Sequence, residues 1–378
     1  MCMLVLACRA ARPYVVCAAV EESHAGSTAP QAPPDVHKRR VRYSGKNPRT
    51  FEAKYKEQRG DAAVIAHVQA KGGTAAGTHR PIAVEELLGV LQVNPGDTVV
   101  DCTLGYGGHA SVLLERVQPG GRLLCLDADG VTLVRTRTRL ESLGHPAGSV
   151  ECVHSNYAAL ASVLLEREPA GAHAILADLG VSSMQLDNPL RGLSYKTDGP
   201  LDMRLDTSRG KPASARLASW TSLELAQLLT DNADEPRAEA LAAAICAAAA
   251  RGPLETTEQL AQVVRRALPR GTPAEDVTAT LRRVFQAIRI AVNGEFEKLD
   301  ALLIALPMAL RPGGRVAILT FHSGEDRRVK LSFKAGLACG LYSHISPIVI
   351  RPSWEEQRSN PRAACAKLRW AQRSADAD

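Results

Sequence analysis

Residues 172–187 read A-H-A-I-L-A-D-L-G-V-S-S-M-Q-L-D, an apolar run that stops at Asp178 and gives way to polar residues. The run is typical of a buried strand, and the segment after it is too rich in Ser, Asp, Asn, Gly and Pro to continue the strand. In an open α/β sheet, ligands bind beyond the carboxyl ends of the strands. We therefore expect Asp178, Ser182 and Gln185 to face a binding crevice. An ordinary strand exit with a capping Asp178 is the alternative.

A glycine turn follows an earlier predicted strand. Residues 97–104 favour a strand that ends in G-Y-G-G-H at positions 105–109, and glycines there let backbone N–H groups approach a ligand closely. The next predicted strand, residues 121–126, ends at Asp127, and an acid about 20 residues after a glycine turn is placed to bind ribose hydroxyls. The combination indicates a nucleoside ligand. Because the glycines lack the G-x-G-x-x-G spacing, S-adenosylmethionine fits better than NAD.

Two further strand ends carry candidate site residues. Residues 149–154 predict a strand that leads to Tyr157, which either lies near an adenine or fills the core. Residues 314–320 predict a strand followed by His322 and Ser323, which would point into the same crevice. No G-x-S-x-G elbow precedes them, so a hydrolase is disfavoured. We favour Ser323 as the N-cap of the next helix, with a pocket role as the alternative.

A long insertion separates the strand at Asp178 from the strand at 314–320. It spans about 135 residues, far more than one crossover helix requires, and so predicts a helical module. We expect helices there at residues 222–229, 237–251 and 257–268, followed by a long one that starts at Pro273. Apolar residues recur in that last helix up to Leu303, and Pro307 is expected beyond its end. Further on, residues 366–370 predict a short edge strand.

Composition limits the classes of function. With 378 residues, of which 45% are hydrophobic and 23% charged, the chain can bury a full core. A net charge of +6 is a mild hint of a polyanionic partner, and 4% aromatic residues disfavour an aromatic stacking platform. The nine cysteines show no zinc or disulfide spacing, so no metal is expected. No apolar run reaches the ~18 residues that span a bilayer, so no membrane partner is expected.

Residues 1–75 are predicted to contain a targeting peptide followed by a basic arm. Residues 1–20 contain arginines but no acid, and a Gly/Ser/Thr/Pro/Ala linker follows, which favours an organelle transit peptide over a bacterial tail. From Lys38 the chain is strongly basic, as expected of a solvated arm or of one that contacts phosphates without reading sequence. The predicted location is the chloroplast, with the mitochondrion or a bacterial-type cytoplasm as alternatives.

Several long motifs together resemble the RsmH (MraW) family, and the likeness covers roughly residues 79–373. The matching stretches are residues 101–109, 178–204, 285–293, 321–327 and 360–362. The resemblance implies an S-adenosylmethionine-dependent methyltransferase that acts on the N4 amine of a cytidine in the decoding centre of small-subunit ribosomal RNA. It implies an α/β, Rossmann-like class I methyltransferase fold with an inserted all-helical domain. We place the methyltransferase domain at 76–190 and 295–378, and the helical substrate-recognition domain at 191–294.

The resemblance also carries over individual roles. For the cofactor, S-adenosylmethionine, it implies Gly107, Gly108 and His109 at the methionine end, Asp127 at the ribose, Tyr157 at the adenine, and Asp178 and Gln185 completing the pocket. Asp178 is also our first candidate to accept the amine proton. The alternative is that Asp178 only binds the methyl donor. Substrate contacts are expected at Ser182, Asp202, Arg204, His322 and Ser323. Residues 232–235 read N-A-D-E where the family has Tyr-Gly-Glu-Glu, and this difference is expected to affect substrate binding.

The sequence is also compatible with other functions. The same fold could act on another nucleic-acid or protein amine, or the chain could be a non-catalytic ribosome-assembly factor that binds RNA through its basic arm. A nicotinamide oxidoreductase is the least favoured. The expected partner is small-subunit ribosomal RNA or the small ribosomal subunit. For the oligomeric state, a homodimer is an open possibility.

Overall fold

The computed structural model describes residues 81–375. The predicted transit peptide and basic arm, residues 1–75, lie outside the described residues. Within residues 81–375, no helix is both long enough and apolar enough to cross a membrane.

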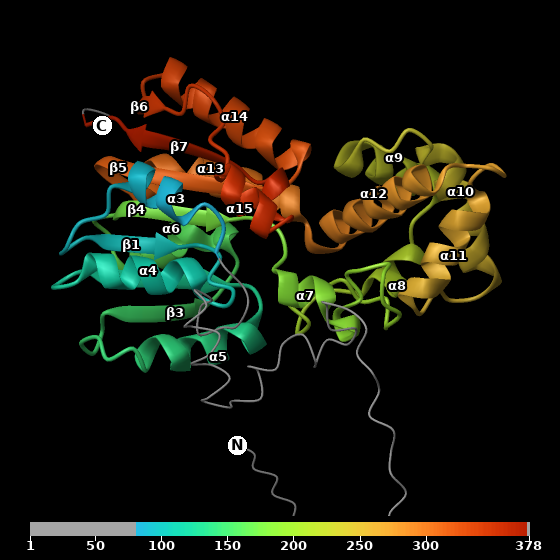
Figure 1. The fold of residues 1–378 in the computed structure, drawn as a ribbon, viewed down its shortest axis with the longest axis horizontal. Coiled ribbons are helices and arrows are strands. Elements are labelled where there is room, and N and C mark those ends of the chain that lie inside the picture. The colour runs from blue at the N-terminus through green and yellow to red at the C-terminus, as the bar shows by residue number, and fades with distance from the viewer. Residues whose placement is uncertain (1–80, 376–378) are drawn as a thin grey trace, which may run out of the picture. The chain divides into compact units, whose positions relative to one another are not determined.

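A seven-stranded sheet forms the centre of the fold (Figure 1). Its strands are β1 (Thr98–Asp101), β2 (Arg122–Asp127), β3 (Val150–His154), β4 (Ala172–Asp178), β5 (Leu310–Thr320), β6 (Tyr342–Ile345) and β7 (Lys367–Arg373). They lie in the order β3-β2-β1-β4-β5-β7-β6, with β1 to β5 parallel and β7 antiparallel to both its neighbours. The fold is Rossmann-like, as predicted.

The predicted strands are confirmed, with one error of position. The last predicted strand exists as β7 but is not at the edge, because β6 pairs along its other side. Sequence patterns missed β6, which has only four residues and no alternation of apolar and polar positions. The edge of the sheet therefore belongs to β6 on one side and β3 on the other.

Helices cover both faces of the sheet. On one face lie α3 (Val84–Leu91), α4 (Gly108–Val117) and α5 (Gly130–Glu141), and on the other α6 (Leu160–Arg167), α13 (Glu295–Ala309) and α14 (Ser323–Ala338). Strand β4 is buried on both sides, with Ile175 and Ala177 in one core and Ala174 and Leu176 in the other. Such a strand reads as one continuous apolar run, as residues 172–177 do.

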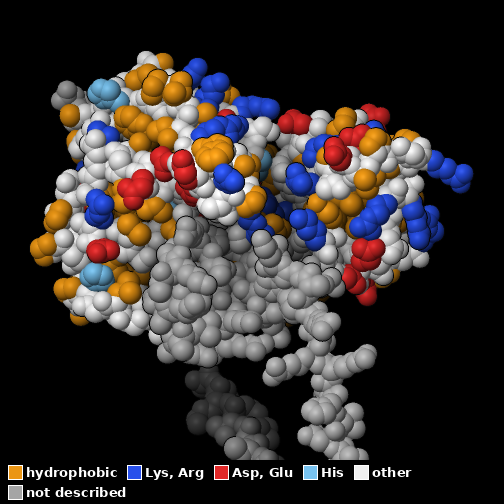
Figure 2. Space-filling view, in the orientation of Figure 1, with side chains coloured by type: hydrophobic (Ala, Val, Ile, Leu, Met, Phe, Trp, Pro, Cys, Tyr) orange, Lys and Arg blue, Asp and Glu red, His pale blue; other side chains and the backbone are white. Residues whose placement is uncertain are grey.

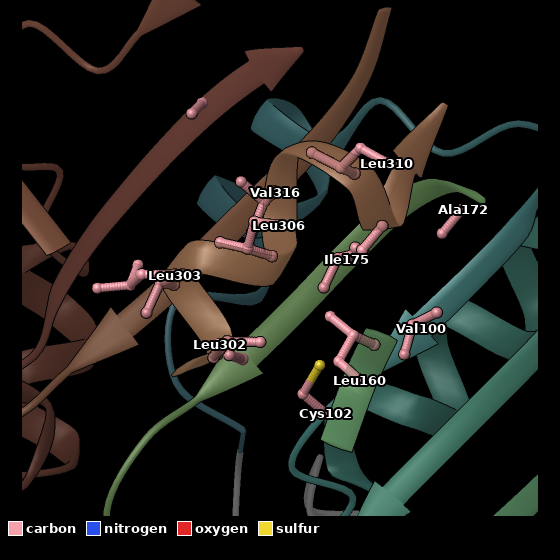
Figure 3. Packing of buried hydrophobic residues seen from close by; sticks show 14 of the residues in the cluster. Val100, Cys102, Leu160, Ala172, Ile175, Leu302, Leu303, Leu306, Leu310 and Val316 are labelled. Carbon is pink, nitrogen blue, oxygen red and sulfur yellow. The ribbon is translucent and has the colours of Figure 1, made fainter. Parts of the chain in front are cut away.

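The core on the α13 side is close-packed aliphatic (Figure 3). Leu302 and Leu306 of α13 are fully buried and lie over the sheet beside Ile175 and Val316. Leu160 of α6 fills the space next to them. This packing fixes the strands whose carboxyl ends carry the predicted site.

The insertion forms a helical cluster with a core of its own. Its helices are α8 (Ala213–Leu217), α9 (Ser222–Ala233), α10 (Ala238–Arg251), α11 (Thr257–Ala267) and α12 (Ala274–Asn293). The three helices predicted at 222–229, 237–251 and 257–268 are confirmed as α9, α10 and α11. Helix α11 begins with a capping box, in which Thr256 Oγ1 accepts from the Gln259 N–H at 3.2 Å.

The long helix predicted from Pro273 is wrong in its length. It breaks at Gly294, which adopts φ +58 and separates α12 from α13. A left-handed residue of this kind ends a helix by turning the chain, and glycine adopts it without strain. Pro307 lies inside α13, not beyond the helix. The apolar stripe continues across the break because α12 packs in the helical cluster and α13 packs on the sheet.

Short elements complete the chain. A single-turn helix, α7 (Ser183–Asp187), follows β4, and α15 (Trp354–Ser359) precedes β7. Single 3-10 turns lie at Tyr157–Ala159, Pro189–Arg191 and Ala363–Cys365. Met203, in the loop after Arg191, has φ +63 and is fully buried. That loop connects the sheet to the helical cluster.

Candidate functional site

Acidic residues gather where the parallel strands end. Asp101, Asp127 and Asp178 close β1, β2 and β4, and these strands are neighbours in the sheet. Burial, the largest cause, raises the pKa of both Asp101 and Asp127 to about 6. Three partly desolvated carboxylates at one edge make a site that favours a cationic ligand.

The glycine turn is locked in place from α5. Thr136 Oγ1 donates to the Gly105 carbonyl at 2.7 Å, and the Arg139 guanidinium donates to the Tyr106 carbonyl. Gly107 caps α4 with φ +68, and a Cβ on it would lie 2.7 Å from Thr136 and 2.8 Å from Arg139. Only glycine fits there, so the turn presents its backbone in one fixed conformation.

Asp127 holds this turn against the end of β2. One carboxylate oxygen accepts from the Gly105 N–H at 2.6 Å and the other from the Asp129 N–H at 2.7 Å. A carboxylate offers about four acceptor sites, so two backbone bonds leave capacity for further donors. The geometry is compatible with the predicted ribose contact, and it gives Asp127 a structural role that the sequence did not indicate.

His109 and Asp178 meet across the site. His109 Nε2 lies 3.0 Å from the Ile82 carbonyl, which can only accept, so Nε2 carries a proton and Nδ1 is an acceptor in the neutral ring. Asp178 Oδ2 lies 3.5 Å from that Nδ1. Burial, and next the charge of Glu325, raise the pKa of Asp178 to about 7. When Asp178 is ionised, two acceptors face each other across this contact, so the contact favours a proton on the pair.

The other carboxylate oxygen of Asp178 makes no hydrogen bond to the described residues. Among the described residues, Oδ1 is buried and has no hydrogen-bond partner. A buried acceptor without a donor is unfavourable by about 1–3 kcal/mol. It is therefore the atom of the site best placed to accept a hydrogen bond from a ligand.

Gln185 and Ser182 are engaged in local structure. They form the capping box of α7, with the Ser182 N–H donating to Gln185 Oε1 at 3.0 Å and the Gln185 N–H donating to Ser182 Oγ at 3.1 Å. Gln185 Nε2 also donates to Asp129 Oδ2 at 3.1 Å. The structure thus brings Gln185 to the strand ends, while Ser182 serves as a helix cap.

Sequence reasoning missed Asp129 and Arg191. Arg191 Nη1 donates to Asp129 Oδ2 at 2.8 Å, and Nη2 donates to the carbonyls of Arg204 and Leu205 at 3.1 and 2.8 Å. Burial alone would raise the pKa of Asp129, but Arg191 and Gln185 hold it below its usual value. The signal was present in the second acid of the D-A-D sequence that ends β2.

The predicted substrate residues Asp202 and Arg204 bind each other. Arg204 Nε and Nη2 donate to the two oxygens of Asp202 at 2.8 and 2.7 Å, a bidentate pair. Asn293, at the end of α12, holds the same loop by accepting from the Leu205 N–H and donating to the Met203 carbonyl, both at 2.8 Å. The loop is therefore a preformed wall between the sheet and the helical cluster.

The prediction that Ser323 caps α14 is wrong. The N-cap is His322, whose Nδ1 accepts from the Glu325 N–H at 3.4 Å, and Ser323 is an exposed first residue of the helix. His322 Nε2 lies 3.2 Å from Glu325 Oε1. Glu325 Oε2 in turn accepts from the Phe321 N–H at 2.8 Å. Imidazole can cap a helix as hydroxyl does, which a Ser-centred pattern overlooks.

Tyr157 lies beside a buried ion pair. Its hydroxyl is 3.5 Å from the Glu295 carbonyl oxygen, and its ring packs on the core below the sheet. Arg289 binds Glu295 through two bonds of 2.8 and 2.9 Å. These two charges were not predicted, because they pair only once Gly294 has turned the chain.

No group of three His, Cys, Asp or Glu side chains within residues 81–375 could hold a metal ion.

Comparison with known proteins finds a matching family model and similar sequences. The model of the MraW methylase family matches residues 76–374. The ribosomal RNA small subunit methyltransferase H 2 of Alkaliphilus metalliredigens is 47% identical over 89% of this chain and 98% of its own. The methyltransferase H 1 of Lachnoclostridium phytofermentans is 46% identical over 89% of this chain and 93% of its own. A solved SAM-dependent O-methyltransferase from Thermotoga maritima is 10% identical, with a TM-score of 0.37 over 83% of this chain and 72% of its own.

Proposed function

The chain belongs to the MraW methylase family, and from that premise we propose that it methylates the N4 amine of a cytidine in the decoding centre of small-subunit ribosomal RNA. The methyl donor is S-adenosylmethionine. Two relatives of closely similar length are named ribosomal RNA small subunit methyltransferases. The observation in the site that carries the proposal is the uncommitted Asp178 oxygen beside the glycine turn.

The residues at the strand ends fit the donor. The turn at Gly107 and Gly108 has no room for side chains because Thr136 and Pro81 pack against it, so its backbone is held in one conformation. The carboxylates of Asp127 and Asp178 can accept hydrogen bonds from hydroxyl and ammonium groups of the donor. We assign Gly107, Gly108, His109, Asp127, Tyr157, Asp178 and Gln185 to donor binding. The bound donor supplies an electrophilic methyl group.

The protein's task toward the cytidine is mostly positioning. The lone pair of an exocyclic cytosine amine is delocalised into the ring, so N4 must be oriented and relieved of a proton as the new C–N bond forms. Asp178 Oδ1 is the acceptor for that proton. The base must leave its stack to reach the strand ends, and the loop held by Asp202 and Arg204 forms one wall of its path.

The first experiment is methyl transfer from labelled donor to small ribosomal subunits that lack the modification, followed by nucleoside mass spectrometry. We expect N4-methylcytidine in the decoding region. Donor binding without transfer would favour the rival readings, either another amine substrate or a non-catalytic assembly factor. Transfer to a different nucleoside would identify that substrate directly.

A variant then tests the role of the carboxylate. Asp178→Asn keeps the shape but cannot take a proton, so turnover should fall on the order of 10²–10⁴-fold while donor affinity is largely retained. Asp276→Asn, at an exposed position in the first turn of α12, is the matched control and should change neither. Equal losses of turnover and donor affinity in Asp178→Asn would restrict Asp178 to donor binding.

Location and oligomeric state complete the proposal. We assign the chain to the chloroplast, with mitochondrion and bacterial-type cytoplasm as alternatives, on the acid-poor composition of its first residues. A fluorescent fusion to residues 1–75 tests this assignment. A homodimer is proposed for the purified protein, and light scattering decides it against a monomer.

A further inference from the structure

A groove lies on the outer part of the molecule between α14 and β6. Its volume is about 560 Å³. Lys330 and Lys334 of α14 line one side and His344 of β6 the other, with Arg369 of β7 at the sheet. The function proposed above uses none of these residues.

The groove is positively charged. Lys330 and Lys334 lie one turn apart and are both exposed, and neither makes an ion pair with any residue of the described part of the chain. No Asp or Glu is among the lining residues. The nearby Asp326 is shared between two cations, Arg369 at 2.7 Å and Lys367 at 3.1 Å. Figure 2 shows basic side chains gathered over α14 on the face it displays.

The groove offers no platform for a base. Phe333, the aromatic residue of its lining, is only 1% exposed. Sequence-tolerant recognition of bases requires exposed rings for stacking, whereas ammonium groups recognise phosphate. The chemistry of the lining therefore suits the backbone of a nucleic acid.

The direction of α14 relates the groove to the site. The helix begins at Ser323, directly after the strand β5 that ends at the proposed site, and runs to Ala338. At a rise of ~1.5 Å per residue, Lys330 and Lys334 lie roughly 10 and 17 Å along the helix from its start. A strand that delivers a nucleotide to the site and continues along α14 would reach these lysines within a few nucleotides.

We propose that Lys330, Lys334 and the groove beside them bind phosphates of the ribosomal RNA substrate a few nucleotides from the target cytidine. The inference rests on the proposed function and extends it to a second contact surface. Such contacts fix the register of the RNA without reading its sequence. They should act on substrate affinity and its salt dependence, and leave the chemical step unchanged.

Binding of unmodified small-subunit RNA and of small ribosomal subunits, measured at several salt concentrations, tests the proposal. For a single-stranded contact each lost phosphate interaction lowers the slope of log affinity against log salt by about 0.7. We expect Lys330→Gln and Lys334→Gln each to show this decrease, and the double variant about 1.4. Arg116→Gln, which removes one exposed charge from α4, is the control and should match the wild type. Turnover at saturating substrate and donor affinity should stay unchanged in all four variants.

Two outcomes would overturn the groove as an RNA site. One is a salt slope in the double variant equal to that of Arg116→Gln. Another is a decrease seen with assembled subunits but absent with naked RNA, which would point to an acidic protein surface. Binding is measured apart from transfer, so a wild type that binds RNA through these lysines but transfers no methyl group would refute the proposed function and leave the groove standing.

Discussion

The strand ends and the helical cluster are stabilised in opposite ways. At the strand ends, Asp101, Asp127 and Asp178 are desolvated and their pKa values are raised to between about 6 and 7. The helical cluster is built mainly from leucine and alanine, as at Leu229 and Leu260, and its buried Glu235 is neutralised by Arg283 at 2.6 Å. The strand ends suit a cationic ligand although burial destabilises their carboxylates, whereas the helical cluster is held together mainly by apolar packing. Mutations should therefore affect the two regions differently.

The largest effect is expected where the two regions are joined. Arg191→Ala removes the partner of Asp129, which is 3% exposed, together with two bonds to the connecting loop. Leaving a buried carboxylate unpaired should lower the free energy of unfolding by about 4 kcal/mol, measured by urea denaturation. Arg209→Ala, whose side chain is 87% exposed beside Asp206, is the control and should change it by under ~0.5 kcal/mol. Similar losses in the two variants would mean that the junction contributes little.

A substitution that leaves a cavity tests the packing of the helical cluster. Leu229→Ala, at a fully buried position of α9, should lower the free energy of unfolding by about 3 kcal/mol. Donor affinity should be unchanged, because the helical cluster does not reach the strand ends through this side chain. Leu223→Ala on the same helix, at an 81% exposed position, is the matched control. A loss of donor affinity in Leu229→Ala would contradict the separation of the two regions.

The sequence predicted what is encoded locally. Strands β1 to β5 follow from continuous apolar runs, and α9 to α11 from their periodicity and caps, because neighbouring residues specify each of them. The charged network was largely missed. Arg191 reaches Asp129 across 62 residues and Arg283 reaches Glu235 across 48, and sequence spacing does not encode such pairs. Likewise, the break at Gly294 depends on two cores that the linear pattern presents as one stripe.

The raised pKa of Asp178 gives a pH-dependent prediction for the donor-free protein. The folded state binds this proton more tightly than the unfolded state, whose pKa is 3.8, so the contribution to stability is lost as pH rises from about 4 through about 7. Asp178→Asn cannot ionise and avoids that loss. A pKa shift corresponds to ~1.36 kcal/mol per unit, and the effect here is reduced because the Asp178 side chain is 26% exposed. The free energy of unfolding of Asp178→Asn, relative to wild type, should therefore rise by about 2 kcal/mol between pH 4 and 8.

Thermal unfolding at several pH values measures this difference, with Asp276→Asn as the control. Asp276 is exposed, so this variant removes a carboxyl group from the protein surface. A pH profile for Asp178→Asn equal to that of Asp276→Asn would show that burial does not perturb the Asp178 carboxyl group. The strand ends would then lack the destabilising buried carboxylate that distinguishes them from the helical cluster.

The smallest effect concerns Asn232, a buried residue of the segment 232–235. Asn232 Nδ2 donates to the Ala287 carbonyl at 3.2 Å and joins α9 to α12. The second link, from Gln286 Nε2 to the backbone carbonyl of residue 232, does not depend on the side chain. Asn232→Ala should therefore lower the free energy of unfolding by only about 1 kcal/mol. Asp231→Ala, exposed on the same helix, should change it less.

Kinetics of the same pair of variants decide what the segment does. If the helical cluster is a scaffold at this position, the KM for small ribosomal subunits stays at the wild-type value in both. Asn232 is buried between α9 and α12, so a larger side chain there would require the two helices to repack. A rise in KM in Asn232→Ala without loss of stability would instead place this part of the cluster in contact with RNA. The RNA-binding site would then extend from the strand ends into α9.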